Sequence, residues 1–173
     1  VAVTYAYQHP ERIHRIVLNT GIVAPRSEKG MQELRDMLER SRNAASALTK
    51  ETVRKRLQWL MYDQSDVTDE LVDIRYRIYS QPGYSTTMLK ITEGVVNNES
   101  ANRDNNFLQE VKAETLVLWT DHNPGCTWEE AKQAATKLPN HKFYLMKNSA
   151  AHWPQWEEPE EFNQVHIEFL RFG

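Results

Sequence analysis

Two polar loops near the end of the sequence carry the side chains best suited to acid–base chemistry. One loop contains Asp121 and Asn123, and the other places His152 directly before Trp153. An imidazole can take a proton from a nucleophile, and a carboxylate beside it fixes its tautomer and stabilises the imidazolium. A neutral amide can hold the tautomer but stabilises the imidazolium less well. The two loops therefore predict the base and the orienting residue of a nucleophilic enzyme.

The elements around these loops predict an α/β fold. Short runs rich in β-branched or aromatic residues at 15–21, 114–120 and 141–146 are typical of buried strands. Helical patterns precede the first run, lie between the second and third, and follow the third. This alternation predicts a parallel sheet covered by helices on both faces. Because ligands of open parallel sheets bind beyond the carboxyl ends of the strands, both polar loops lie where a site is expected.

A long helical stretch interrupts this alternation from about residue 27 to residue 105. We expect one of its helices to begin at Thr49 and another at Thr68, because each threonine is a suitable N-cap followed by acids. The run Gln81 to Gly83 ends the second of these helices, and a further helix is predicted over 86–96. The predicted organisation is a core at 1–26, a helical lid at 27–105 and the rest of the core at 106–173.

Composition excludes several classes of function. The 173 residues are 40% apolar and 26% charged with a net charge of −3, as in soluble globular proteins, and the basic residues are scattered. A nucleic-acid surface needs a basic patch, and a membrane span needs ~20 apolar residues, so neither partner is expected. The single cysteine, Cys126, favours a reducing, cytoplasmic location. No metal-binding motif is present, and we expect no metal or other cofactor.

The sequence opens inside a helical pattern, in which Val1 and Tyr5 share a face and which closes at Pro10. A helix that starts without a cap at the first residue leads us to expect a piece of a longer protein. A small-molecule substrate is the expected partner, and a homo-oligomer is compatible with the sequence.

Three stretches resemble the α/β-hydrolase superfamily. They are A-Y-Q-H-P-E-R-I-H-R-I-V-L, V-K-A-E-T-L-V-L-W-T and A-A-H-W-P-Q-W-E-E-P-E-E-F-N-Q-V-H-I-E-F-L. More narrowly, the chain resembles the meta-cleavage product hydrolases, which cut carbon–carbon bonds in ring-opened aromatic catabolites. H-W-P-Q-W-E resembles their His-Trp pair, M-Y-D-Q-S-D-V-T-D-E-L-V-D-I-R their lid helix, and L-N-T-G the strand end that enters the lid.

The resemblance implies a role for five residues. His152 would be the catalytic base, Trp153 a wall of the active site, and Arg75 the lid residue that binds a dienoate carboxylate. The superfamily pattern W-G-x-x-D places its aspartate at position 123, which is Asn123 here. Asp121 is the nearest carboxylate. Either residue could orient His152, and the charge of Asp121 slightly favours it.

The same resemblance implies a serine-type hydrolase that needs no cofactor and acts on a vinylogous 1,5-diketone. The family's chain order is Ser, acid, His, and no G-x-S-x-G motif occurs in this sequence. We therefore expect the serine upstream and expect these residues alone to be inactive. Two alternatives stay open, an ester or amide hydrolase of the same fold and a non-catalytic hydrolase-like binding protein.

Overall fold

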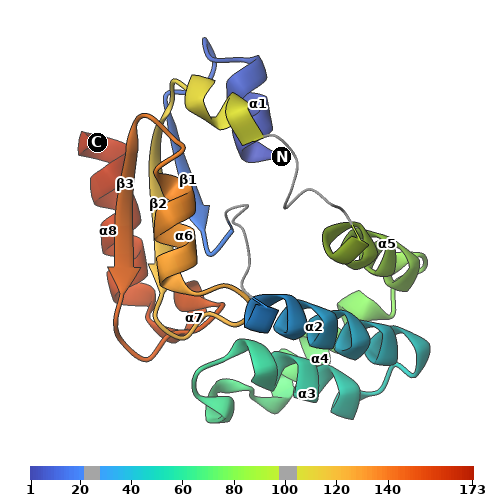
Figure 1. The fold of residues 1–173 in the computed structure, drawn as a ribbon. Coiled ribbons are helices and arrows are strands. Elements are labelled where there is room, and N and C mark those ends of the chain that lie inside the picture. Colours follow the sequence, from blue (N-terminus) through green and yellow to red (C-terminus); the bar gives the residue numbers. More distant parts are fainter. Residues whose placement is uncertain (22–27, 98–104) are drawn as a thin grey trace.

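Three parallel strands form the centre of the molecule (Figure 1). The computed structural model describes residues 1–21, 28–97 and 105–173. The strands are β1 (Arg15–Asn19), β2 (Glu114–Thr120) and β3 (His141–Met146), in the order β1-β2-β3. All three predicted strands are confirmed, although the first ends at Asn19, two residues before the predicted end at residue 21.

Helices cover both faces of this sheet, as predicted. Successive side chains of a strand point to opposite faces, so the sheet has two apolar surfaces. One surface packs against α1 (Ala2–Gln8), η3 (Asn105–Glu110) and α6 (Trp128–Ala135). The other surface packs against α8 (Pro159–Phe172), which follows the short α7 (Pro154–Glu157). The central strand β2 is buried over all but its first residue, as a strand enclosed on both faces should be.

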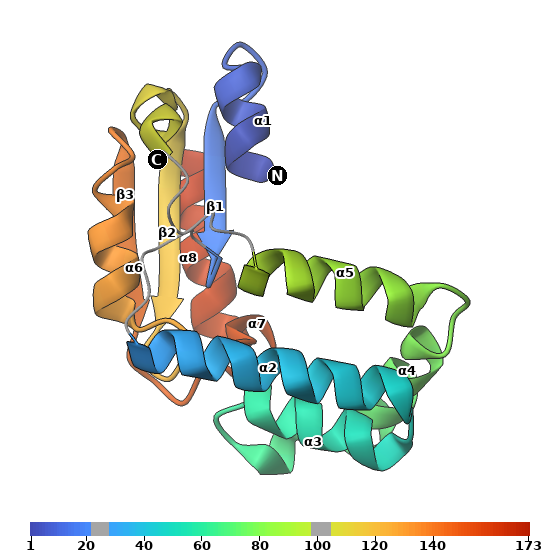
Figure 2. The ribbon, with the colours of Figure 1, turned by 45° about the vertical axis from the view of Figure 1, so that its right-hand side comes forward.

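Between β1 and β2 the chain forms a helical segment, residues 28–97. It contains α2 (Glu28–Ser46), α3 (Lys50–Leu60), η1 (Gln64–Asp66), α4 (Asp69–Tyr79) and α5 (Tyr84–Asn97). The segment has its own apolar cluster, separate from the sheet, built on residues that include Val53, Leu57, Leu71 and Val72. Figures 1 and 2 show that it lies beyond the carboxyl ends of the strands. The predicted boundary at 26/27 falls on residues 22–27, and the approach to the one at 105/106 on residues 98–104, both outside the described residues.

The predicted helix starts in this segment are confirmed. The hydroxyl of Thr49 accepts a hydrogen bond from the N–H of Thr52 at 3.1 Å, and that of Thr68 accepts one from the N–H of Leu71 at 3.2 Å. Each bond satisfies one of the N–H groups that a helix leaves unpaired at its N-terminus. The starts of these two helices are therefore set by local sequence signals.

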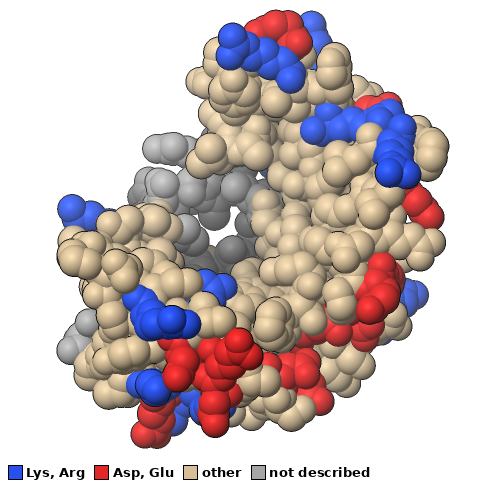
Figure 3. Space-filling view, turned by 180° about the vertical axis from the view of Figure 1, so that it is seen from behind, with Lys and Arg blue, Asp and Glu red and all other residues tan. Residues whose placement is uncertain are grey.

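Charged side chains form separate small groups on the face drawn in Figure 3, with uncharged surface between them. In the parts of the chain that the structure describes, no helix is both long and apolar enough to cross a membrane. Within the same residues, no three histidine, cysteine or acidic side chains are grouped so that they could hold a metal ion.

Candidate active site

The two polar loops identified in the sequence meet beyond the ends of β2 and β3. Nδ1 of His152 lies 2.8 Å from the side-chain oxygen of Asn123, at hydrogen-bonding distance. Asp121 comes directly after β2, its side chain is exposed, and among the described residues it has no hydrogen bond with His152. The structure therefore pairs the histidine with the amide, not with the carboxylate that the sequence slightly favoured.

The hydrogen bonds of the Asn123 amide settle the tautomer of His152. Its Nδ2 donates to the backbone carbonyls of Pro124 and Cys126, each at 3.2 Å, which leaves the amide oxygen facing the imidazole. An amide oxygen can only accept, so Nδ1 of His152 must carry the proton. The other ring nitrogen, Nε2, is then unprotonated and free to take a proton. This is the form that a general base requires.

The surroundings of His152 favour the neutral imidazole. Burial lowers its pKa below the usual 6.5, because it removes water that would stabilise the imidazolium. The positive charge of Arg56 on α3 lowers the pKa further. The sequence analysis did not single out Arg56. The available signal was its position three residues after the buried Val53, on the inward side of the helix.

Backbone hydrogen bonds hold the loop that carries His152. The N–H of His152 donates to the carbonyl of Leu60, the last residue of α3, at 3.0 Å. One residue earlier, the carbonyl of Ala151 accepts a hydrogen bond from the fully buried hydroxyl of Thr120 at 2.6 Å. The loop is thus connected both to the helical segment and to the end of β2.

The end of β1 also reaches this loop. Thr20 adopts a φ of 45°, which is rare for a β-branched residue, and its hydroxyl donates to the carbonyl of His152 at 3.5 Å. Beside it, Nδ2 of Asn19 donates to Oε1 of Gln155 at 3.3 Å. The side-chain oxygen of Asn19 is buried without a hydrogen-bond partner among the described residues. The strand end that the sequence marked as L-N-T-G therefore lies next to the histidine loop.

Trp153 and Arg75 are brought together although they are 78 residues apart in the sequence. The guanidinium carbon of Arg75, on α4, lies 4.3 Å from the centre of the Trp153 ring, a cation–π contact. The same indole packs against the apolar cluster of the helical segment. Both residues that the resemblance assigned to the substrate thus contact each other. Of the two, Trp153 directly follows His152 in the chain.

Arg75 is partly buried, yet none of the ion pairs among the described residues includes it. Its charge acts on Tyr84. Burial and the neighbouring Tyr79 raise the pKa of Tyr84, and the charges of Arg56 and Arg75 reduce that rise. The rings of Tyr79 and Tyr84 are stacked with centroids 4.8 Å apart. The charges of Arg56 and Arg75 thus both act on Tyr84, and that of Arg56 also acts on His152.

Glu157 is a further residue of the site that the sequence analysis missed. Its carboxylate accepts hydrogen bonds from the backbone N–H groups of Ala151, at 2.8 Å, and of Tyr62. Burial raises its pKa, and backbone hydrogen bonds oppose that rise. Position in the H-W-P-Q-W-E motif was the only available signal, because its partner Tyr62 is 95 residues away.

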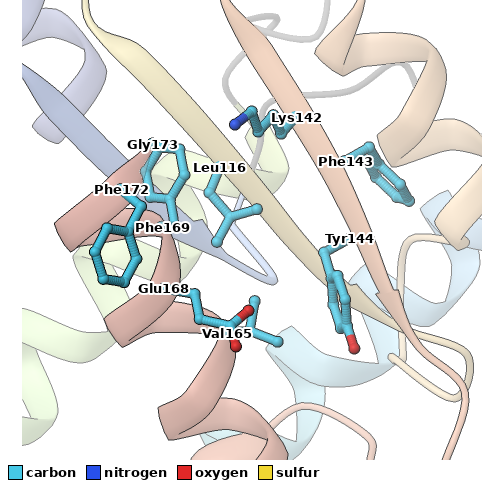
Figure 4. A pocket seen from close by; sticks show the side chains of 9 residues that line it. All are labelled: Leu116, Lys142, Phe143, Tyr144, Val165, Glu168, Phe169, Phe172 and Gly173. Carbon is cyan, nitrogen blue, oxygen red and sulfur yellow. The ribbon is translucent and has the colours of Figure 1, made fainter.

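A pocket of about 600 Å³ lies elsewhere, between α8 and strands β2 and β3 (Figure 4). Its walls include Leu116, Tyr144, Phe169 and Phe172, with Lys142 at the rim. None of the residues His152, Asn123 or Arg75 lines it. We therefore separate this pocket from the candidate active site.

The chain is similar in sequence to a known family and to individual known proteins. The family described as alpha/beta hydrolase fold matches residues 1–159. A 2-hydroxy-6-oxononadienedioate/2-hydroxy-6-oxononatrienedioate hydrolase of Burkholderia vietnamiensis is 27% identical, over 98% of this chain and 58% of its own length. A 2-hydroxy-6-oxo-6-phenylhexa-2,4-dienoate hydrolase of Comamonas testosteroni is 25% identical over the same shares. The chain thus spans less than two thirds of the length of these relatives.

Solved structures show the same fold. The 2-hydroxy-6-oxo-6-phenylhexa-2,4-dienoate hydrolase of Rhodococcus sp. strain RHA1 superposes with a TM-score of 0.80 at 16% identity, over 98% of this chain and 59% of that one. A thermophilic esterase of Thermogutta terrifontis superposes with a TM-score of 0.64 at 24% identity, over 99% and 60%. One architecture therefore serves enzymes whose names indicate different substrates.

Proposed function

Because the chain belongs to the α/β-hydrolase fold family, we propose that it is the C-terminal part of a serine-type hydrolase that cleaves a carbon–carbon bond in a meta-cleavage product. Two kinds of support converge on this substrate. Relatives along nearly the whole chain carry the names of 2-hydroxy-6-oxo-dienoate hydrolases. The site also combines a base with a cation suited to a carboxylate. The nucleophilic serine would come from outside these residues, since the sequence holds no G-x-S-x-G.

In this proposal His152 is the general base and Asn123 orients it. The amide holds the proton on Nδ1, so Nε2 takes the proton of the serine or of the attacking water. Because the amide is neutral, the imidazolium that forms receives less stabilisation than an aspartate would provide. The lowered pKa of His152 keeps the imidazole neutral and ready to act near pH 7.

The observation that carries the substrate assignment is Arg75 on the face of Trp153, at 4.3 Å. A guanidinium stays charged at all relevant pH values and can grip a carboxylate with two parallel hydrogen bonds. Among the described residues no carboxylate pairs with Arg75, so its charge is available to a substrate. A dienoate bound there would extend toward His152, the neighbour of Trp153.

The helical segment would act as the lid of this site. It lies beyond the carboxyl ends of the strands and contributes Arg75, and Leu60 holds the backbone of His152. We retain the organisation of a core at 1–26, a lid at 27–105 and a core at 106–173 as part of the proposal. A small-molecule substrate and a cytoplasmic location complete it.

The test compares Arg75→Leu with Arg77→Leu in the parent protein that contains this chain. Arg77 is exposed on the same helix and serves as a matched control. We expect Arg75→Leu to raise KM for a 2-hydroxy-6-oxo-dienoate by at least about tenfold, as the loss of a charged hydrogen bond predicts. Turnover of a neutral ester should change little. Equal effects of the two substitutions on the dienoate would contradict the substrate assignment.

An ester hydrolase is the second candidate, favoured by the similarity to the thermophilic esterase. In that case Arg75→Leu would leave turnover of a preferred ester unchanged, and no dienoate would be hydrolysed. A non-catalytic binding protein is the third candidate, since Asn123 takes the place of the family's aspartate. If the unaltered parent protein bound a dienoate but hydrolysed neither dienoates nor esters, that alternative would be favoured.

A further inference from the structure

Glu157 joins two parts of the molecule that are far apart in the sequence. It ends α7, immediately after the loop that carries His152. One oxygen of its carboxylate accepts the N–H of Ala151 at 2.8 Å, and the other accepts the N–H of Tyr62, the second residue after α3. A single side chain therefore bridges the histidine loop and the helical segment.

The bridge is made directly beside His152 in the chain. The N–H of Ala151, the residue before His152, donates to the Glu157 carboxylate, and the backbone N–H of Glu157 donates to the carbonyl of Trp153, the residue after His152, at 3.1 Å. The N–H of His152 itself points to the carbonyl of Leu60 at 3.0 Å. Two successive backbone N–H groups, those of Ala151 and His152, thus bind the Glu157 carboxylate and the end of α3. The position of the imidazole is consequently tied to the position of the helical segment.

The energetics make this bridge sensitive to change. Burial raises the pKa of Glu157, and the nearby Asp66 raises it as well, while the backbone N–H groups of Ala151, Tyr62 and Trp153 oppose both effects. A partly buried carboxylate is stable only while its hydrogen bonds are made, and bonds to a charged acceptor are about twice as strong as neutral ones. Loss of either partner leaves a charge or an N–H group without its bond.

We propose that Glu157 is a positioning residue that couples the placement of the helical segment to the orientation of His152. It acts through the backbone, and among the described residues its carboxylate has no hydrogen bond with the imidazole of His152 or with the guanidinium of Arg75. The inference rests on the proposed role of His152 as the base. Ordering of the helical segment over a substrate would, through Glu157, also order the base.

The first test compares Glu157→Gln with Glu160→Gln in the 173-residue chain. Glutamine keeps one acceptor oxygen but presents an NH2 group to a backbone donor, whereas Glu160 is exposed in the first turn of α8. We expect Glu157→Gln to speed amide hydrogen exchange at Ala151, His152 and Tyr62 by about tenfold, as loss of one charged bond predicts. Nitrogen NMR of His152 should change from the Nδ1–H tautomer to a mixture. Glu160→Gln should change neither.

A second pair of variants tests the bridge from the other side and leaves Glu157 intact. Tyr62→Pro removes the N–H donor, and residue 61 already has the extended backbone, φ −101° and ψ 146°, that precedes proline. Tyr62→Ala keeps the donor but loses the ring contact with His122. The coupling predicts that only the proline variant speeds exchange at Ala151 and mixes the tautomers of His152.

The outcomes separate this inference from the proposed function. If His152 of the unaltered chain is not the Nδ1–H tautomer, the proposed role of the histidine is wrong. If it is, but Glu157→Gln and Tyr62→Pro behave like their controls, only the coupling is wrong. In the parent enzyme, Glu157→Gln should lower kcat by a larger factor than it raises KM, since Arg75 is untouched. A change confined to KM would overturn the positioning role.

Discussion

The side-chain oxygen of Asn123 accepts a hydrogen bond from Nδ1 of His152 at 2.8 Å. Because Nδ2 of the same amide is occupied by the carbonyls of Pro124 and Cys126, the amide cannot turn over without losing two hydrogen bonds. The histidine is therefore held as a neutral base by a neutral partner. Its charge state depends on burial and on the charge of Arg56 rather than on a carboxylate.

Replacing Asn123 by aspartate should raise the pKa of His152. A carboxylate at that position would attract the imidazolium, which the amide does not. The pKa is measured by following the ring protons of His152 by NMR as a function of pH. Asp121→Asn, which removes a charge from the same loop without a hydrogen bond to His152, should leave the pKa near its starting value. A larger shift from Asp121→Asn than from Asn123→Asp would show that Asp121 is the effective partner.

Replacing Arg56 by glutamine should also raise the pKa of His152. The positive charge of Arg56 is the second cause of the lowered pKa, after burial, and glutamine removes that charge while it keeps a polar side chain. The same NMR titration measures the change. Arg77→Gln is the matched control, because Arg77 is exposed on α4. An unchanged pKa in Arg56→Gln would place the guanidinium too far from the imidazole to act on it.

Stability should fall as the pH falls through about 6.5, the usual pKa of histidine, because of His152. Its pKa is lowered in the folded protein, so the unfolded chain binds more protons between the folded pKa and 6.5. Acid therefore favours unfolding in that window. The raised pKa of Glu157 acts in the opposite direction near its own, lower range. Urea unfolding from pH 5 to pH 8 should give a shallower pH dependence for His152→Gln than for the unaltered chain. Parallel curves would contradict the prediction.

Truncation of Leu57 to alanine should destabilise the helical segment by about 2–5 kcal/mol, the usual range for a buried leucine. Leu57 is fully buried in the apolar cluster that also receives Trp153. Urea unfolding measures the loss, and Ile74→Ala, at a side chain that is 38% exposed, should cost much less. Loss of packing in the cluster should also leave Trp153 less well packed, and a change in tryptophan fluorescence would report this. Similar costs for the two substitutions would show that the segment contributes little to the measured stability.

Much of the fold could be predicted because its signals are local. Short apolar runs predicted the three strands, and the hydroxyls of Thr49 and Thr68 marked helix starts that the structure confirms. Each signal depends on a few neighbouring residues and on the fixed periods of helix and strand. The same reasoning placed both polar loops at the carboxyl edge of the sheet, where they do meet.

Which side chains touch within that edge could not be predicted from the sequence. Asp121 and Asn123 are two residues apart in one loop, and the hydrogen bonds that turn Asn123 toward His152 depend on the path of residues 124–126. The other contacts could not be predicted because they join residues that are far apart in the sequence. Glu157 and Tyr62 are 95 residues apart, and no local pattern connects them.

The elements, their order and the edge of the sheet where the histidine lies could thus be predicted from the amino-acid sequence, because periodicity and capping are properties of short segments. The folded arrangement was needed to show that an amide orients His152, that Arg75 rests on Trp153 and that Glu157 joins the loop to the helices. These contacts arise from the packing of distant segments. Their free energy depends on burial and geometry that no short stretch of sequence encodes.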